Sequence, residues 1–376
     1  MSVDKSHRHI ENDEQYKSLN VNKGIDRPEI FNENSIQRFL KNKRRKLLTP
    51  DEYVEGILAG NRTTLSQAVT LVESSKKEHQ EIAQDIITKC LPHSGNSLRI
   101  GITGVPGVGK STFIESMGKY ITKRGGKLAV LAIDPSSERS KGSILGDKTR
   151  MEELSSDPNA YIRPSPSAGS LGGVARKTRE TIVLCEAAGF DTIFIETVGV
   201  GQSETMVHSM VDFFLLLMLA GAGDELQGIK RGIMEMADVI TINKADGNNI
   251  DKAEMARVQY KNALHLFPPT DSGWKPEVLT CSAILHAGID KVWMTILKYV
   301  ELVKKNSYFQ HKRNEQSKFW MYETINDRLK SDFYQNDILK GMTAEFEKKV
   351  LGEEMSSFVA ARELLENYYQ SKKNNK

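Results

Sequence analysis

Short apolar runs alternate with amphipathic stretches between residues 96 and 305. Uninterrupted apolar runs of about four to eight residues are typical of buried strands in a parallel sheet. The amphipathic stretches between them have the helical period of elements that cover such a sheet. We expect strands over residues 98–102, 128–133, 192–195, 213–220, 239–242 and 278–281. The pattern therefore predicts an α/β fold in which helices flank a mostly parallel sheet.

The regions on either side of residues 96–305 have helical patterns. Residues 46–95 carry an apolar stripe, and Thr64 with Gln67 indicates a capping box at the start of one helix. Residues 306–376 carry broad apolar faces, which could pack on the sheet domain or pair with a second copy of the chain. We expect the second arrangement, a homodimer. The polar residues 1–45 show no clear period and predict a mobile arm.

The segment Gly104–Ser111 fits the pattern G-x-x-x-x-G-K-[ST] at every position. It lies between a predicted strand and a predicted helix, as this phosphate-binding motif requires. Backbone N–H groups of such a loop surround a polyphosphate, Lys110 can reach the outer phosphates, and the Ser111 hydroxyl can bind Mg²⁺. The predicted fold class is therefore a P-loop NTPase. The predicted phosphate-binding residues are Gly104, Val105, Pro106, Gly107, Val108, Gly109, Lys110, Ser111 and Thr112.

A second motif, Asn243-Lys244-Ala245-Asp246, follows the predicted strand 239–242 and matches N-K-x-D. The Asp246 carboxylate can accept two hydrogen bonds from N1–H and N2–H₂ of guanine, and adenine offers no such pair. The motif alone could be a surface turn, but with the phosphate loop it favours GTP over ATP. Three residues after the last strand could offer backbone N–H groups to guanine O6, and these are Ser282, Ala283 and Ile284.

Several acids are placed to hold Mg²⁺. Glu196 follows an apolar strand, where a phosphate-loop enzyme needs an acid near the metal, and the N–H of Gly199 can face the γ-phosphate. Helix capping is the alternative role for Glu196. Asp134 ends the second strand, and Asp147 lies in the polar stretch after it. With Ser111, these acids offer four oxygen groups to one hard cation.

Composition limits the partners of the chain. Among 376 residues, Lys and Arg number 52 and Asp and Glu number 49, so the formal net charge is +3 and indicates neither nucleic acid nor membrane as a partner. The basic cluster 41–46 is a solvated linker or, alternatively, a nucleic-acid patch. The basic loop 227–232 is an exposed turn or a second switch.

The acidic N-terminus and three widely spaced cysteines, Cys90, Cys185 and Cys281, predict a cytoplasmic protein with reduced thiols.

These motifs together resemble the MeaB/ArgK-type GTPases, the chaperones associated with adenosylcobalamin-dependent methylmalonyl-CoA mutase. The resemblance is carried by Gly104–Thr112, Asp134–Ser137, Gly142–Met151, Glu196–Gln202 and Asn243–Gly247. It covers roughly residues 51–305. Generic GTPases lack the segments Gly142–Met151 and Glu196–Gln202, so the set as a whole is specific.

The resemblance implies a homodimeric G protein with slow GTP hydrolysis that its partner accelerates. Such a protein would bind the mutase, gate the loading of intact cofactor and protect the enzyme. The metal and switch acids of the family map onto Asp134, Asp147 and Glu196, and its third switch lysine maps onto Lys230. With Lys110, these are the residues that we expect to carry catalysis. The partner would be methylmalonyl-CoA mutase or a related acyl-CoA mutase.

Two other functions remain open at this point. One is a metallochaperone GTPase for another metalloenzyme, which should carry Cys and His ligands near its switches. The other is a kinase that transfers phosphate to a small molecule, which would be separated from a GTPase by assays with candidate acceptors. The sequence shows no such cluster of Cys and His, which counts against the first.

Overall fold

The computed structural model describes residues 47–133, 151–164, 171–197, 203–221 and 231–374. Every helix and strand in these ranges belongs to one unit, Thr49–Lys376. The predicted arm 1–45 lies outside the described residues. So do four predicted site residues, which are Asp134, Asp147, Gly199 and Lys230.

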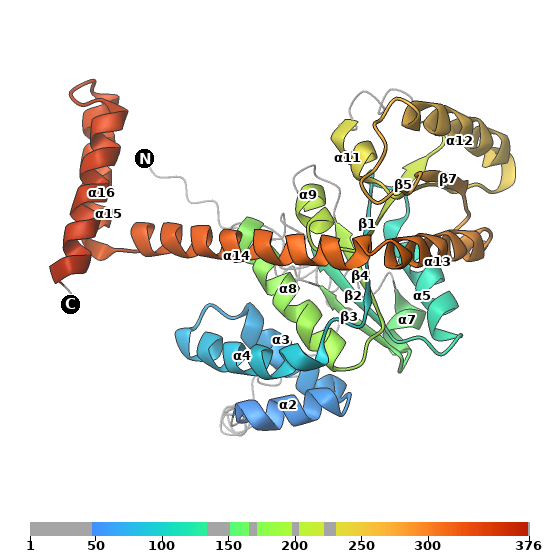
Figure 1. Cartoon of the computed structure of the whole chain (residues 1–376), viewed down its shortest axis with the longest axis horizontal. Coiled ribbons are helices and arrows are strands. Elements are labelled where there is room, and N and C mark those ends of the chain that lie inside the picture. The colour runs from blue at the N-terminus through green and yellow to red at the C-terminus, as the bar shows by residue number, and fades with distance from the viewer. Residues whose placement is uncertain (1–46, 134–150, 165–170, 198–202, 222–230, 375–376) are drawn as a thin grey trace, which may run out of the picture. The chain divides into compact units, whose positions relative to one another are not determined.

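Seven parallel strands form one sheet in the order β3-β2-β4-β1-β5-β6-β7. Their bounds are β1 Leu98–Gly104, β2 Leu128–Ile133, β3 Ala160–Pro164, β4 Thr192–Thr197, β5 Phe213–Leu219, β6 Val239–Asn243 and β7 Glu277–Thr280. The predicted fold class is confirmed: this is a parallel sheet flanked by helices with a helical C-terminal region (Figure 1). The sequence pattern missed β3. Its five residues include Arg163 and end in Pro164, which is tolerated because β3 is an edge strand.

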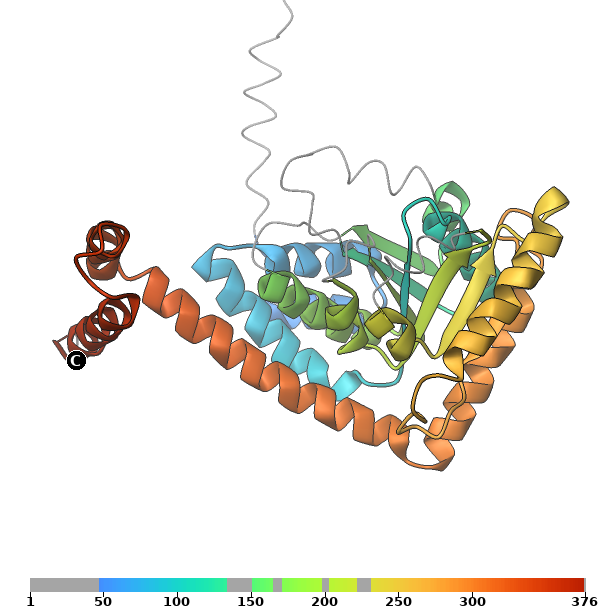
Figure 2. The ribbon, with the colours of Figure 1, turned by 90° about the horizontal axis from the view of Figure 1, so that it is seen from above.

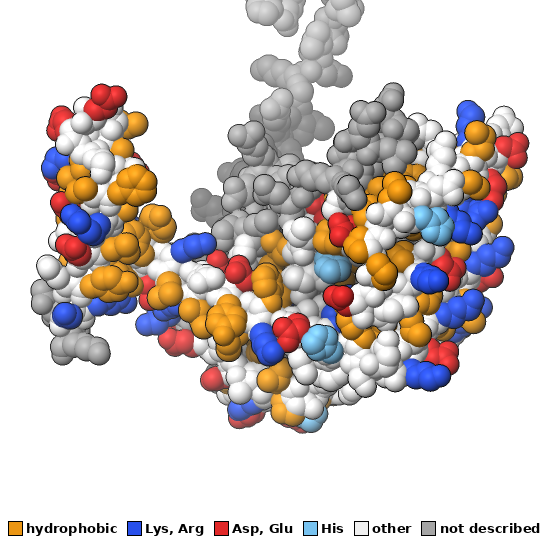
Figure 3. All heavy atoms as spheres, turned by 45° about the horizontal axis from the view of Figure 1, so that its top comes forward, with side chains coloured by type: hydrophobic (Ala, Val, Ile, Leu, Met, Phe, Trp, Pro, Cys, Tyr) orange, Lys and Arg blue, Asp and Glu red, His pale blue; other side chains and the backbone are white. Residues whose placement is uncertain are grey.

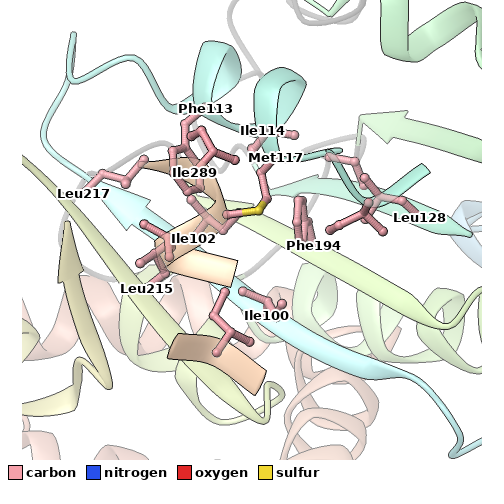
Figure 4. Packing of buried hydrophobic residues seen from close by; sticks show 14 of the residues in the cluster. Ile100, Ile102, Phe113, Ile114, Met117, Leu128, Phe194, Leu215, Leu217 and Ile289 are labelled. Carbon is pink, nitrogen blue, oxygen red and sulfur yellow. The ribbon is translucent and has the colours of Figure 1, made fainter. Parts of the chain in front are cut away.

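Helices pack on both faces of the sheet. On one face, α5 (Lys110–Thr122) and α13 (Ile289–Lys305) bury their apolar sides against β1 and β5. Figure 4 shows Phe113 and Met117 of α5 in this core, with Ile102 of β1 and Leu215 of β5. On the opposite face, α11 (Arg231–Met236) and α12 (Ile250–Leu264) cover β5, β6 and β7. The helices α7 (Glu152–Ser156), α8 (Leu171–Ala187) and α9 (Ser203–His208) complete the layers.

Three N-terminal helices precede the sheet: α2 (Pro50–Leu58), α3 (Arg62–Glu73) and α4 (Lys77–Cys90). They pack on one another and on α8. The predicted capping box at Thr64 is wrong, because α3 is capped by Asn61 and Thr64 lies within its first turn. The real capping box belongs to α2, where Thr49 and Glu52 exchange side-chain hydrogen bonds with each other's backbone N–H groups.

Three helices follow α13 and form the C-terminal region. They are α14 (Tyr308–Tyr334), α15 (Asp337–Leu351) and α16 (Ser357–Asn374). Figure 2 shows α14 as one long helix that runs past α8 and leads to the α15–α16 pair. The ring of Phe333 at the end of α14 packs edge-to-face on Tyr368 of α16, with centroids 5.3 Å apart.

The beginning of α14 is tied to the sheet edge at which the parallel strands begin. Both carboxylate oxygens of Asp212 accept hydrogen bonds from Arg313, at 2.7 and 2.8 Å. The guanidinium of Arg99 makes a second two-pronged ion pair with Glu186, at 2.8 and 3.0 Å. Asp212 and Glu186 are almost fully buried. We refer to Arg99, Glu186, Asp212 and Arg313 as the amino-edge network.

Two further predictions bear on the environment of the chain. Cys90, Cys185 and Cys281 are buried and form no disulfide, as expected. Burial raises the pKa of the Cys90 thiol to about 11 and that of Cys281 to about 12, so both are protonated at neutral pH. Within the described ranges, no helix has the length and apolarity needed to cross a membrane.

Candidate functional site

The phosphate loop connects β1 to α5 at the edge where the parallel strands end, which we call the carboxyl edge. Two of its glycines are required by the backbone. Gly104 has φ 154°, and a Cβ there would lie 2.4 Å from the carbonyl oxygen of Leu217 on β5. Gly109 has φ 91°, which a side chain would strain. The N-terminus of α5 is therefore presented to this edge of the sheet, as the motif predicted, and its orphan N–H groups favour an anion.

Lys110, the first residue of α5, folds its side chain back over the loop. Its ammonium donates to the carbonyl oxygen of Gly104 at 2.8 Å and to that of Val105 at 3.4 Å. Burial lowers the pKa of Lys110, and the charges of Glu196 and Glu204 act in the opposite direction. Carbonyl oxygens are weaker partners for an ammonium than phosphate oxygens, so a polyphosphate in the loop can take over this lysine.

Ser111 and Glu196 meet at the same edge. The Ser111 hydroxyl donates to Glu196 Oε1 at 3.5 Å, and Glu196 is 9% exposed at the end of β4. A hydroxyl and a carboxylate oxygen are ligands of the kind that Mg²⁺ prefers, so these two residues fit the predicted metal site. No three His, Cys, Asp or Glu side chains cluster into a metal site within the described ranges, which do not include Asp134 and Asp147.

The loop after β6 contacts the phosphate loop directly. Asn243, which is buried, donates from Nδ2 to the carbonyl oxygen of Val108 at 2.8 Å. Lys244 donates from Nζ to the carbonyl oxygen of Gly107 at 2.8 Å and adopts a left-handed φ of 58°. The structure thus brings together two motifs that are about 130 residues apart in the sequence, as their placement at strand ends predicted.

Asp246 faces the loop that follows β7. Its Oδ2 accepts a hydrogen bond from the Ser282 hydroxyl at 2.5 Å. The backbone N–H of Ala283 donates to Asn243 Oδ1 at 3.1 Å, so in this structure it is used within the protein. Ile284 is 69% exposed next to them. The predicted base-reading residues are therefore adjacent, although a contact of Ser282, Ala283 or Ile284 with guanine O6 stays a prediction.

Comparison with known proteins agrees with these motifs. A family model described as the methylmalonyl-CoA mutase-associated GTPase MeaB matches residues 65–337. The chain belongs to the MeaB family. A probable GTPase of Mycobacterium tuberculosis is 47% identical over 318 residues, which cover 85% of this chain and 95% of that protein. The mitochondrial methylmalonic aciduria type A homolog of Mus musculus is 45% identical over 328 residues, covering 85% and 79% respectively.

One solved structure is also similar to this MeaB-family chain. The crystal structure of a LAO/AO transport system kinase superposes with a TM-score of 0.68 at 37% identity, and the match covers 85% of this chain and 99% of that one. Fold, motifs and family thus agree that this MeaB-family protein is a GTPase.

Glu204 was not among the predicted site residues. In this MeaB-family GTPase, Glu204 is 2% exposed on α9, and its charge acts on Lys110 together with that of Glu196. A buried carboxylate near the phosphate-loop lysine balances its positive charge. The only sequence signal was its position shortly after Gly199, because the fold and not the spacing brings it close to Lys110.

Proposed function

We propose that this chain is a Mg²⁺-dependent GTPase that acts as a chaperone of an adenosylcobalamin-dependent acyl-CoA mutase, with methylmalonyl-CoA mutase as the preferred partner. The observation that carries the GTPase assignment is the direct link between the phosphate loop and the base-reading loop, from Asn243 Nδ2 to the carbonyl oxygen of Val108. A nucleotide whose phosphates lie on the first loop has its base at the second. Asp246 would then select guanine by accepting hydrogen bonds from N1–H and N2–H₂ of the base.

In the proposed reaction, water attacks the γ-phosphate and GDP leaves. Lys110 and the N–H groups of the loop would stabilise the charge that develops on the phosphate oxygens, and the N–H of Gly199 stays a predicted donor to the γ-phosphate. Mg²⁺, when bound, would neutralise phosphate charge, and Ser111 and Glu196 would hold it with Asp134 and Asp147. The expected intrinsic rate is slow, as the resemblance to the family implies.

We further propose that the nucleotide acts as a switch. The γ-phosphate of GTP would order the loops that contain Asp134, Asp147 and Gly199, and hydrolysis would release them. Lys230 would belong to a third segment of this kind. The mutase would respond to this difference, so that GTP binding and hydrolysis gate the loading of adenosylcobalamin and protect the loaded enzyme.

We propose that the C-terminal helices form a homodimer. Figure 3 shows apolar side chains gathered on α15 and α16. Several large apolar residues on α14–α16 are between 45% and 87% exposed, and examples are Tyr322, Leu329, Ile338, Leu351 and Phe358. A soluble monomer rarely leaves so much apolar surface in contact with water, and a second copy would cover it. A cytoplasmic location is consistent with three cysteines that form no disulfide.

The chaperone assignment is tested by mixing the chain with purified methylmalonyl-CoA mutase and measuring complex formation by size-exclusion chromatography. GDP and a non-hydrolysable GTP analogue are compared, each with Mg²⁺. We expect a complex whose affinity differs between the two nucleotides, and a GTPase rate that rises when the mutase is added. No complex in either nucleotide state would contradict the chaperone assignment and leave the GTPase assignment standing.

A further inference from the structure

A hydrogen bond joins the phosphate-loop helix to the loop that follows β7. Ser116 Oγ on α5 and Nδ1 of His286 lie 2.6 Å apart. Ser116 is 3% exposed and lies beyond Ser111 on the same helix. His286 is itself exposed, and within the described ranges its side chain forms a hydrogen bond with this buried hydroxyl. The bond therefore ties an outer loop to a rigid helix.

His286 holds an unusual backbone conformation. Its φ is 54°, in the left-handed region that residues other than glycine seldom adopt, although histidine does so more often than most. The backbone N–H groups of Ser282 and Ala287 each donate to the other residue's carbonyl oxygen, at 2.9 and 3.1 Å, so His286 closes a tight turn. The cost of the strained conformation is offset only if other contacts hold the turn. The hydrogen bond to Ser116 is such a contact.

The same turn holds the base-reading carboxylate. The Ser282 hydroxyl donates to Asp246 Oδ2 at 2.5 Å and accepts a hydrogen bond from the backbone N–H of Leu285 at 3.2 Å. The N–H of Ala283 donates to Asn243 at 3.1 Å. A displacement of the turn would therefore move the partners of both Asn243 and Asp246.

We propose that Ser116 and His286 are positioning residues for guanine recognition. They fix the turn Ser282–Ala287 against α5, so that Ser282 holds Asp246 in the orientation that accepts two hydrogen bonds from guanine. This inference rests on the proposed GTPase function. In this proposal both residues act through Ser282 and Asp246, so the effect is on base selection and not on the γ-phosphate. The helix α5, which follows the phosphate loop, thereby also sets the geometry of the residues that recognise guanine.

The experiment compares variants that separate the hydrogen bond from the backbone strain. Ser116→Ala removes the bond without changing any residue of the turn. His286→Gly removes the bond and relieves the strain, whereas His286→Asn keeps an acceptor near the Nδ1 position and tolerates the left-handed region. For each variant, calorimetry gives the dissociation constants of GDP and of inosine diphosphate, which lacks the N2 amino group. The turnover number at saturating GTP and the melting temperature are measured alongside.

Ser116→Ala and His286→Gly should each weaken GDP binding about fivefold, as expected for one hydrogen bond, and reduce the preference for GDP over inosine diphosphate. The double variant should be no worse than either single variant, His286→Asn should approach the wild type, and the turnover number should not change. A lower melting temperature with unchanged base preference, or additive losses in the double variant, would overturn the inference alone. Failure of the wild type to bind GDP would overturn the proposed GTPase function with it.

Discussion

The two edges of the sheet use charged residues in opposite ways. At the amino edge, Arg313 and Asp212 are both at most 10% exposed in their side chains and satisfy each other through two hydrogen bonds. At the carboxyl edge, among the described residues, the ammonium of Lys110 donates to backbone carbonyl oxygens, and Glu196 and Glu204 are near. One edge holds its charges in closed pairs, and the other holds a charge that a ligand can engage.

This difference separates structural from functional charge. Removing one member of a buried ion pair lowers the free energy of unfolding strongly, because the other member is left charged and unpaired. A lysine that rests on carbonyl oxygens can exchange them for phosphate oxygens at little cost. Substitutions at the amino edge should therefore change the free energy of unfolding, and those at the carboxyl edge should change nucleotide affinity or turnover.

The largest effect is expected for Lys110→Ala. By analogy with the arginine finger, a cation that contributes about 10³- to 10⁵-fold to phosphoryl transfer, loss of the Lys110 charge should lower turnover by about 10³-fold. The melting temperature should change little, because the charge of Lys110 is not part of a closed pair. Phosphate release from GTP measures this, with the exposed Lys123→Ala at the end of the same helix as the control. Unchanged hydrolysis would contradict the phosphate-loop assignment.

Arg313→Met should give the opposite result. Loss of the guanidinium leaves Asp212 buried and unpaired, which costs about 3–5 kcal/mol in the free energy of unfolding. Urea denaturation measures the loss. Lys318→Met on the same helix is the matched control, because its ion pair with Glu315 is exposed and should contribute little. If both variants lose the same free energy of unfolding, the buried pair at the amino edge contributes no more to stability than an exposed pair, and the proposed difference between the edges is wrong.

Asp246→Asn should change base selection without loss of stability. The amide cannot accept from both N1–H and N2–H₂ of guanine, so GDP affinity should fall by about 10²-fold and xanthosine diphosphate should bind better than in the wild type. Competition titrations with both nucleotides measure the shift. Retained selectivity for guanine would exclude Asp246 from the base site.

Glu196→Gln should lower Mg²⁺-dependent turnover by about 10- to 100-fold. The amide has the same shape as the carboxylate but no charge to offer the metal. GDP affinity measured without Mg²⁺ should remain near that of the wild type. If GDP affinity falls and turnover does not, Glu196 lies outside the metal shell.

The smallest effect concerns pH. Burial, followed by the charge of Lys312, lowers the pKa of His208 from 6.5 to about 4. The folded state therefore favours the neutral ring, and its stabilising contribution is lost as pH falls from 6.5 towards 4. The slope is at most about 1.4 kcal/mol per pH unit. His208→Leu should flatten the curve of unfolding free energy against pH in this window.

The elements that the sequence predicted correctly are those whose signals lie within a short stretch of the chain. The phosphate loop, its strand and its helix lie within Leu98–Thr122, where glycine spacing and apolar runs suffice. Edge strand β3 was missed because a short segment with Arg163 and Pro164 lacks the apolar signal of a central strand. The Arg313–Asp212 pair joins residues 101 apart, and local patterns carry no information about such a contact.

The candidate site divides in the same way. Sequence spacing identified Lys110 and Asp246, whose motifs are local. The approach of Glu204 to Lys110 and the bond between Ser116 and His286 depend on how the strands are ordered, so no motif indicated them. Helix capping also depended on context. Thr49 and Thr64 each lie three residues before a Glu or Gln, but only Thr49 occupies the N-cap position of a helix.

The most direct test of the account is a calorimetric titration of the purified chain with GDP and, in parallel, with ADP, both in the presence of Mg²⁺. The account predicts saturable binding of GDP at one site for each chain and no measurable heat from ADP at the same concentrations. Equal affinity for the two nucleotides, or no heat from either, would contradict it.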